Sequence, residues 1–133
     1  MKAIFFLLIL SFSILPQSSP KFEEYFLDET LRIDYFHIGD VKTEMITIDK
    51  MFRYGIWAGS LNHLIDNFNN GKYYLKIYDY NSGNLIYSKG FDTFFGEYAS
   101  GDDGINGIQK SFHETAIIPF PKNKIAFVLE KRD

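Results

Sequence analysis

The sequence predicts an all-β domain, an antiparallel β-sandwich of about seven short strands. Apolar and polar residues alternate over 73–78 and again over 85–89, which is the pattern of strands with one buried face. Residues 79–84 separate these two runs and contain Asn and Gly, which permit a chain reversal, so we expect a β-hairpin. Aromatic residues form 18% of the chain and supply bulky side chains to fill the space between two sheets.

Length and charge limit the possible functions. The 133 residues suffice for one domain with a core and are too few for two. The net charge is −3 and no long basic run occurs, so the electrostatic pattern of a nucleic-acid-binding protein is missing. The sequence contains no cysteine, which excludes disulfides, thiolate zinc sites and cysteine nucleophiles.

The N-terminus has the layout of a cleavable secretory signal peptide, which we place at residues 1–19. Met1-Lys2 precedes an apolar run over 3–10, and small residues follow at Ser18 and Ser19. The apolar run is shorter than the roughly 20 residues that a spanning helix needs. We therefore expect a secreted or periplasmic protein without a membrane span after cleavage, with the β-sandwich domain over residues 20–133.

The first half of the predicted domain contains two strands and a loop. Residues 22–28 fit either a short helical turn or a lead-in to the sheet. Residues 30–38 alternate as a strand, and residues 44–52 form a second strand that we expect to pair with the first. Residues 61–71 lack this period and are rich in Asn and Asp, so we predict an ordered loop, pinned by Leu61, Leu64 and Phe68.

The half that follows the hairpin contains two further strands. Residues 90–98 are apolar enough for a packed corner or a short strand, and the composition of residues 99–107 predicts a flexible loop. Residues 110–119 alternate as a strand, which we expect to end at Pro119-Phe120-Pro121 because proline has no backbone N–H. Residues 124–131 form the last strand.

The sequence predicts no catalytic residue, no metal site and no cofactor. His113-Glu114 begins like the zinc motif H-E-x-x-H, but position 117 is Ile, and we expect both residues on the surface of a strand. His37 and His63 have no histidine or carboxylate at ligand spacing. The acidic loop 101–107 resembles part of a calcium loop without its distal glutamate, so ordinary turn chemistry is favoured over calcium binding.

Aromatic residues supply the candidate binding surface. Trp57 with Tyr54 and the hairpin tyrosines would form a platform on which sugars stack. The alternative, which we favour, is that Trp57 fills the core, as tryptophan commonly does in a sandwich. The apolar corner with Phe94 and Phe95 is the second part of the candidate surface.

The order of short motifs along the chain points to one family. The motifs are Leu31-Arg32-Ile33-Asp34-Tyr35, Trp57-Ala58-Gly59-Ser60, Leu85-Ile86-Tyr87-Ser88, Phe95-Gly96-Glu97-Tyr98 and Pro119-Phe120-Pro121-Lys122. Together they resemble the N-terminal domain of the secreted bacterial IgA-peptidase family of zinc metallo-endopeptidases. The resemblance covers residues 22–133.

The resemblance implies a β-sandwich that precedes a zinc peptidase domain. In that family the zinc ligands and the catalytic glutamate belong to the following domain, and no position of this chain matches them. The resemblance therefore implies a non-catalytic accessory domain, which docks to the peptidase catalytic domain or holds a glycoprotein substrate. The alternative that the residues leave open is a stand-alone carbohydrate-binding module that uses Trp57 and nearby tyrosines.

Overall fold

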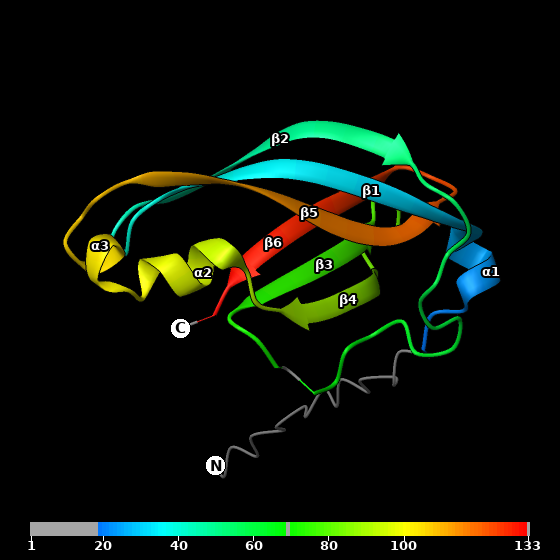
Figure 1. Cartoon of the computed structure of the whole chain (residues 1–133). Coiled ribbons are helices and arrows are strands. Elements are labelled where there is room, and N and C mark those ends of the chain that lie inside the picture. The colour runs from blue at the N-terminus through cyan, green and yellow to red at the C-terminus, as the bar shows by residue number, and fades with distance from the viewer. Residues whose placement is uncertain (1–18, 69, 133) are drawn as a thin grey trace, which may run out of the picture.

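The computed structural model describes residues 19–68 and 70–132, and within them the chain forms a β-sandwich (Figure 1). Six strands make two antiparallel three-stranded sheets, which confirms the predicted fold class. The predicted signal peptide over residues 1–19 lies outside the described residues, apart from Ser19. No helix within the described ranges is long and apolar enough to cross a membrane.

The first sheet is built around β1 (Phe26–Gly39), with β2 (Glu44–Arg53) on one side and β5 (Lys110–Pro121) on the other. β1 and β2 form the predicted pair, joined by a tight turn after Gly39. Gly39 has a φ of 139°, and a Cβ there would lie 1.9 Å from Thr43 O, so only glycine fits this turn.

The second sheet has the order β4-β3-β6 and contains the predicted hairpin. β3 (Tyr73–Asp79) pairs with β4 (Leu85–Phe91) and with β6 (Ile125–Lys131). The Asp79 carboxylate closes the hairpin turn by accepting hydrogen bonds from Ser82 N (2.8 Å) and Ser82 Oγ (2.7 Å). The left-handed residue in this turn is Gly83, with a φ of 71°.

Alternating residues of the two sheets meet in one core. Along β3 every second residue is buried, and the same alternation runs along β5 from Glu114 to Ile118. The core joins the two sheets through the side chains of Phe26, Ile33, Tyr35, Leu75, Ile77, Ile86, Tyr87 and Ile118. Trp57 is 8% exposed and belongs to this core, in agreement with the favoured interpretation that it fills the core.

The described residues contain three short helices, α1 (Phe22–Tyr25), α2 (Phe94–Ala99) and α3 (Asp102–Ile105). α1 forms where a helical turn was one of two expectations, whereas α2 and α3 lie where the sequence predicted a corner and a loop. α1 comes directly before β1, whereas α2 and α3 pack together at the opposite end of the sandwich (Figure 1). The apolar corner at 90–98 is therefore the end of β4 followed by α2. Thr93 begins α2, because its hydroxyl accepts a hydrogen bond from Gly96 N at 2.9 Å.

Two further predictions need correction. β5 continues through Pro119 and Pro121, because it is an edge strand and its prolines need no donor toward a neighbour on the free side. Of the three residues predicted to pin the loop before β3, Leu64 alone is buried, while Leu61 is 48% and Phe68 85% exposed. Leu64 holds this loop together with a hydrogen bond of 2.9 Å from Ser88 N to Leu64 O.

The two isoleucines at the end of β5 provide a matched test of the core. Ile118 is fully buried, whereas its neighbour Ile117 points to the other face and is 45% exposed. We expect Ile118→Ala to lower the free energy of unfolding by about 2–5 kcal/mol, because it leaves a cavity in the core. Ile117→Ala should cost less than about 1 kcal/mol in the same urea titration. Equal losses in the two variants would contradict the assigned faces of β5.

Candidate functional site

The sandwich has two lateral sides, and they differ. On one side, β2 and β6 are joined by an ion pair of 2.7 Å between Lys131 Nζ and Glu44 Oε2. On the other side, the edges of β4 and β5 are separated by a cavity of about 730 Å³ near α2. This second side is the candidate functional site, because concave surfaces between sheets and loops are where ligands bind.

Aromatic and charged side chains line the cavity beside α2. Phe91 from the end of β4 and Phe94 from α2 supply apolar walls, and Phe94 is 74% exposed. The ionisable groups are Asp92, Glu97, Glu114 and Lys72, with Tyr35 also in the wall. The cavity therefore combines aromatic surface with an excess of carboxylates.

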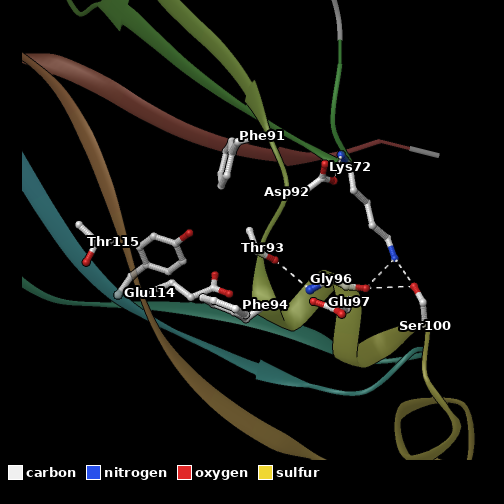
Figure 2. A pocket seen from close by; sticks show the side chains of 11 residues that line it. Lys72, Phe91, Asp92, Thr93, Phe94, Gly96, Glu97, Ser100, Glu114 and Thr115 are labelled. Atoms are coloured by element: carbon white, nitrogen blue, oxygen red, sulfur yellow. Dashed lines mark hydrogen bonds between the residues drawn. The ribbon is translucent and has the colours of Figure 1, made fainter. Parts of the chain in front are cut away.

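Lys72 is the basic residue of the lining, and its ammonium group already has partners. Lys72 Nζ donates to Ser100 Oγ at 3.0 Å and to Gly96 O at 3.3 Å, which ties the end of the loop before β3 to α2 (Figure 2). The backbone N–H of Lys72 donates to Asp92 Oδ1 at 2.8 Å. These bonds fix the rim of the cavity.

A buried histidine lies under the site. His37 on β1 has no solvent exposure, and its ring stacks on Phe95 of α2 with a centroid distance of 3.9 Å. Its Nδ1 lies 3.0 Å from Glu114 Oε2, and its Nε2 lies 2.6 Å from Glu44 Oε1. Because a carboxylate only accepts hydrogen bonds, both contacts are satisfied when both ring nitrogens carry a proton.

The carboxylates beside His37 have further partners in two other elements, α2 and β6. Glu114 on β5 also accepts a hydrogen bond of 3.0 Å from Phe95 N at the start of α2. Glu44 on β2 also accepts the ammonium of Lys131 from β6. The cluster of His37, Glu44, Glu114 and Lys131, which we call the histidine cluster, therefore links both sheets and α2.

The histidine cluster keeps its carboxylates ionised. Burial on its own would raise the pKa of Glu114, but hydrogen bonds from His37 and from Phe95 N outweigh burial and lower that pKa. Burial also opposes ionisation of Glu44, and hydrogen bonds from Lys131 and His37 lower its pKa in the same way. Burial raises the pKa of the neighbouring Tyr35, so its hydroxyl is neutral at physiological pH.

Sequence reasoning missed the histidine cluster. His37 has carboxylate partners after all, and Glu114 is 9% exposed and therefore not a surface residue of its strand. The partners lie 7 and 77 residues away in the chain, so no local spacing reveals them. One signal was available, because Glu114 shares the parity of the buried Ala116 and His37 shares that of the buried Ile33 and Tyr35.

A second cavity, also of about 730 Å³, lies further along the same side of the sandwich. Its apolar lining comes from Trp57 and Phe68 of the long loop between β2 and β3, from Tyr87 of β4 and from Ile117 of β5. The Trp57 ring meets Tyr87 edge to face, with a centroid distance of 5.9 Å, and its Nε1 donates to Ser60 O.

The predicted binding residues do not form one surface. Phe94 lines the cavity beside α2, and Trp57 lines the second cavity. Phe95 has no solvent exposure, because it stacks on His37 inside the molecule. Tyr54 follows β2, is 62% exposed and lines neither cavity.

β2 is an unusually exposed edge strand. Its large apolar side chains Met45, Ile48, Met51 and Phe52 are 55%, 46%, 61% and 43% exposed. They occur on both faces of the strand, and Tyr54 and Ile56 continue the exposed apolar run beyond its end. Long, exposed apolar edge strands of this kind are typical of surfaces that bind another protein or domain.

The acidic loop 101–107 contains the short helix α3, which the sequence did not predict. Asp102 and Asp103 lie in its first turn, and Asp103 Oδ2 lies 3.1 Å from Lys110 Nζ. Within the described part of the chain, no group of three or more His, Cys, Asp or Glu is arranged to hold a metal ion.

Comparison with known proteins finds one family. Residues 21–133 match the family model described as Peptidase M64 N-terminus, and M64 is the IgA peptidase family that the motifs resemble. No curated protein matches the chain.

Acid should weaken the histidine cluster. A carboxyl group with a lowered pKa in the folded protein adds stability above its unfolded pKa, near 4.5 for Glu, and loses it as pH falls through the folded value. We expect the free energy of unfolding, measured by urea titration, to fall as pH drops below about 4.5. Glu114→Gln should be less stable at neutral pH and lose less on acidification, because one of the two carboxylates is gone.

The matched control is Glu23→Gln, which neutralises an exposed glutamate of α1. Its stability should follow that of the unchanged protein at every pH. If Glu114→Gln showed the same acid sensitivity as the unchanged protein, the assignment of that sensitivity to the histidine cluster would be wrong.

Proposed function

The chain belongs to the peptidase M64 N-terminal family, and on that premise we propose that it is a non-catalytic accessory domain that docks onto a peptidase domain. The observation that carries this proposal is the exposed apolar surface of β2, formed by Met45, Ile48, Met51 and Phe52. Stable interfaces between domains that stay together are apolar and resemble a divided core. β2 offers such a surface along ten residues.

The position of β2 supports this assignment. β2 is an edge strand of its sheet, so a partner can contact its free backbone edge as well as its side chains. Asp49 and Lys50 interrupt the apolar run in its middle, at the β-bulge opposite Asp34 and Tyr35. Charges and bulges on an edge strand discourage indiscriminate pairing with other strands, which suits a surface meant for one partner.

We also propose that the domain works outside the cytoplasm. The support is the charged start, apolar run and small residues of positions 1–19, which fit an export signal. A chain without cysteine folds without disulfides, so export adds no requirement for oxidative folding.

A charge introduced on β2 should weaken docking. We expect the protein to bind the purified peptidase domain of an M64 peptidase in isothermal titration calorimetry, and Ile48→Lys or Met51→Lys to weaken binding by about tenfold or more, because a buried ammonium has no partner there. Both side chains are exposed in the free domain, so these variants should still fold.

The matched control for that experiment is Ile105→Lys on α3, where a comparably exposed isoleucine (57%) lies outside β2. Its affinity should equal that of the unchanged protein. Failure of the unchanged protein to bind the peptidase domain, or equal weakening by Ile105→Lys, would overturn docking through β2.

The carbohydrate-binding alternative makes a separate prediction. Trp57 is the sole tryptophan, and burial of its ring in the core predicts blue-shifted fluorescence that acrylamide quenches poorly. We expect no change in this emission when glycans are added, since the ring packs against Tyr87. A glycan-induced shift or quench would favour the carbohydrate-binding module over the accessory domain.

A further inference from the structure

β5 has a free edge. It is the last strand of the first sheet, and among the described residues its backbone pairs with β1 alone. The outward residues His113, Thr115 and Ile117 are exposed, whereas Glu114 and Ala116 between them are buried. An unpaired edge of this kind accepts an additional strand through main-chain hydrogen bonds.

The facing edge of β4 is already covered. Ser88 N donates to Leu64 O, and Gly90 N donates to Asp66 Oδ2 at 2.7 Å, so the long loop occupies the edge of β4. Asp66 N in turn donates to Ser88 Oγ at 2.9 Å. Of the two strand edges on this side of the sandwich, β5 is therefore the one that remains open for a partner (Figure 1).

The two cavities meet β5 at alternate residues. Thr115 lines the cavity beside α2, and Ile117 lines the second cavity. Residues two apart in an extended chain are separated by about 7 Å and point to the same face. An added strand along β5 would therefore bring its own alternate side chains to the two cavities in turn.

The cavity beside α2 has the charge to receive a basic side chain. Asp92 and Glu97 are exposed carboxylates of its lining, whereas Glu114 at its base is already paired with His37. The ammonium of Lys72 is held by Gly96 O and Ser100 Oγ and offsets one of these charges. The exposed ring of Phe94 adds a face on which a guanidinium group stacks favourably.

The second cavity has the lining to receive an apolar side chain. Trp57, Ile65, Phe68, Tyr87 and Ile117 give it aromatic and aliphatic walls. Phe68 is 85% exposed and lies at the edge of this cavity, so an apolar side chain entering it would cover surface that is now in contact with water.

We propose that the free edge of β5 binds an extended peptide segment as an added strand, with a basic side chain in the cavity beside α2 and an apolar side chain two residues away in the cavity beside Trp57. Main-chain bonds to β5 supply affinity, and the two cavities supply selectivity for the side chains. The recognised element is a short extended sequence in which a basic and an apolar residue are separated by one position.

The occupant of this groove is a segment of a protein substrate. The assignment rests on the proposed accessory role, in which the apolar surface of β2 makes the lasting contact with the peptidase. A groove that recognises a short backbone segment and two side chains, one of them basic, suits an interaction that forms and dissociates. The two surfaces use different strands and so are testable separately.

The test uses two probe peptides, acetyl-TTRTLTT-amide and acetyl-TTLTRTT-amide, which place the basic and apolar residues in either order. We expect one of them to bind the ¹⁵N-labelled protein and to shift the NMR signals of β5 and α2 while leaving those of β2 unchanged. Replacing Arg by Glu in that peptide should weaken binding by about tenfold or more, because the carboxylates repel it.

Glu97→Lys should weaken binding of the arginine peptide and strengthen binding of the glutamate peptide. Glu23→Lys makes the same change on α1, outside both cavities, and should leave both affinities unchanged. Absence of binding, equal binding of the two peptides, or shifts centred on β2 would overturn the proposal. Since the assay contains no peptidase, its result is independent of docking through β2.

A competition experiment identifies the occupant. Adding the peptidase domain should leave the peptide-induced shifts of β5 in place, because docking uses β2. Displacement of the peptide by the peptidase domain would overturn the assignment to a substrate and make a segment of the peptidase the occupant. Retention of the peptide with the peptidase bound supports the assignment.

Discussion

The arrangement of the whole molecule depends on one buried histidine that is held between two glutamates. His37 belongs to the central strand of the first sheet, Glu44 and Glu114 belong to the strands on either side of it, and all three meet inside the sandwich. A buried charge is tolerated when it is paired and fully hydrogen-bonded, and costs several kcal/mol when it is not. The three strands therefore hold one register, because a shift of one residue would turn these side chains to opposite faces.

The same cluster determines where the cavity beside α2 lies. Glu114 accepts the N–H of Phe95, and the Phe95 ring covers His37, so the start of α2 is fixed against the end of the first sheet. The residue before Phe95 is thereby left exposed on the outside, where Phe94 becomes a wall of the cavity. On the opposite side of the sandwich, the Lys131 contact to Glu44 draws β6 toward β2. One side is thus bridged by an ion pair and the other is open.

The sequence allowed prediction of those elements that local chemistry decides. The β3–β4 hairpin and the β1–β2 pair follow from alternation and turn residues, and both form as expected. α2 was missed because a six-residue helix is too short to show a helical period, and its start depends on a Thr93 cap. The histidine cluster was missed for a different reason. Its members come from four strands. A single sequence does not show which residues from distant strands meet in the folded chain.

A histidine flanked by carboxylates resembles part of a catalytic site, yet the geometry here argues for a positioning role. A general base needs a ring nitrogen that is free to take a proton from a substrate within hydrogen-bonding reach. Both nitrogens of His37 already face carboxylate oxygens, at 2.6 and 3.0 Å, and the ring is enclosed by Phe95 and Tyr73. A substrate in the cavity would meet Glu114, whose carboxylate is already engaged with His37 and Phe95. The histidine therefore holds β1, β2, β5 and the start of α2 in place, which agrees with the proposed role as an accessory domain.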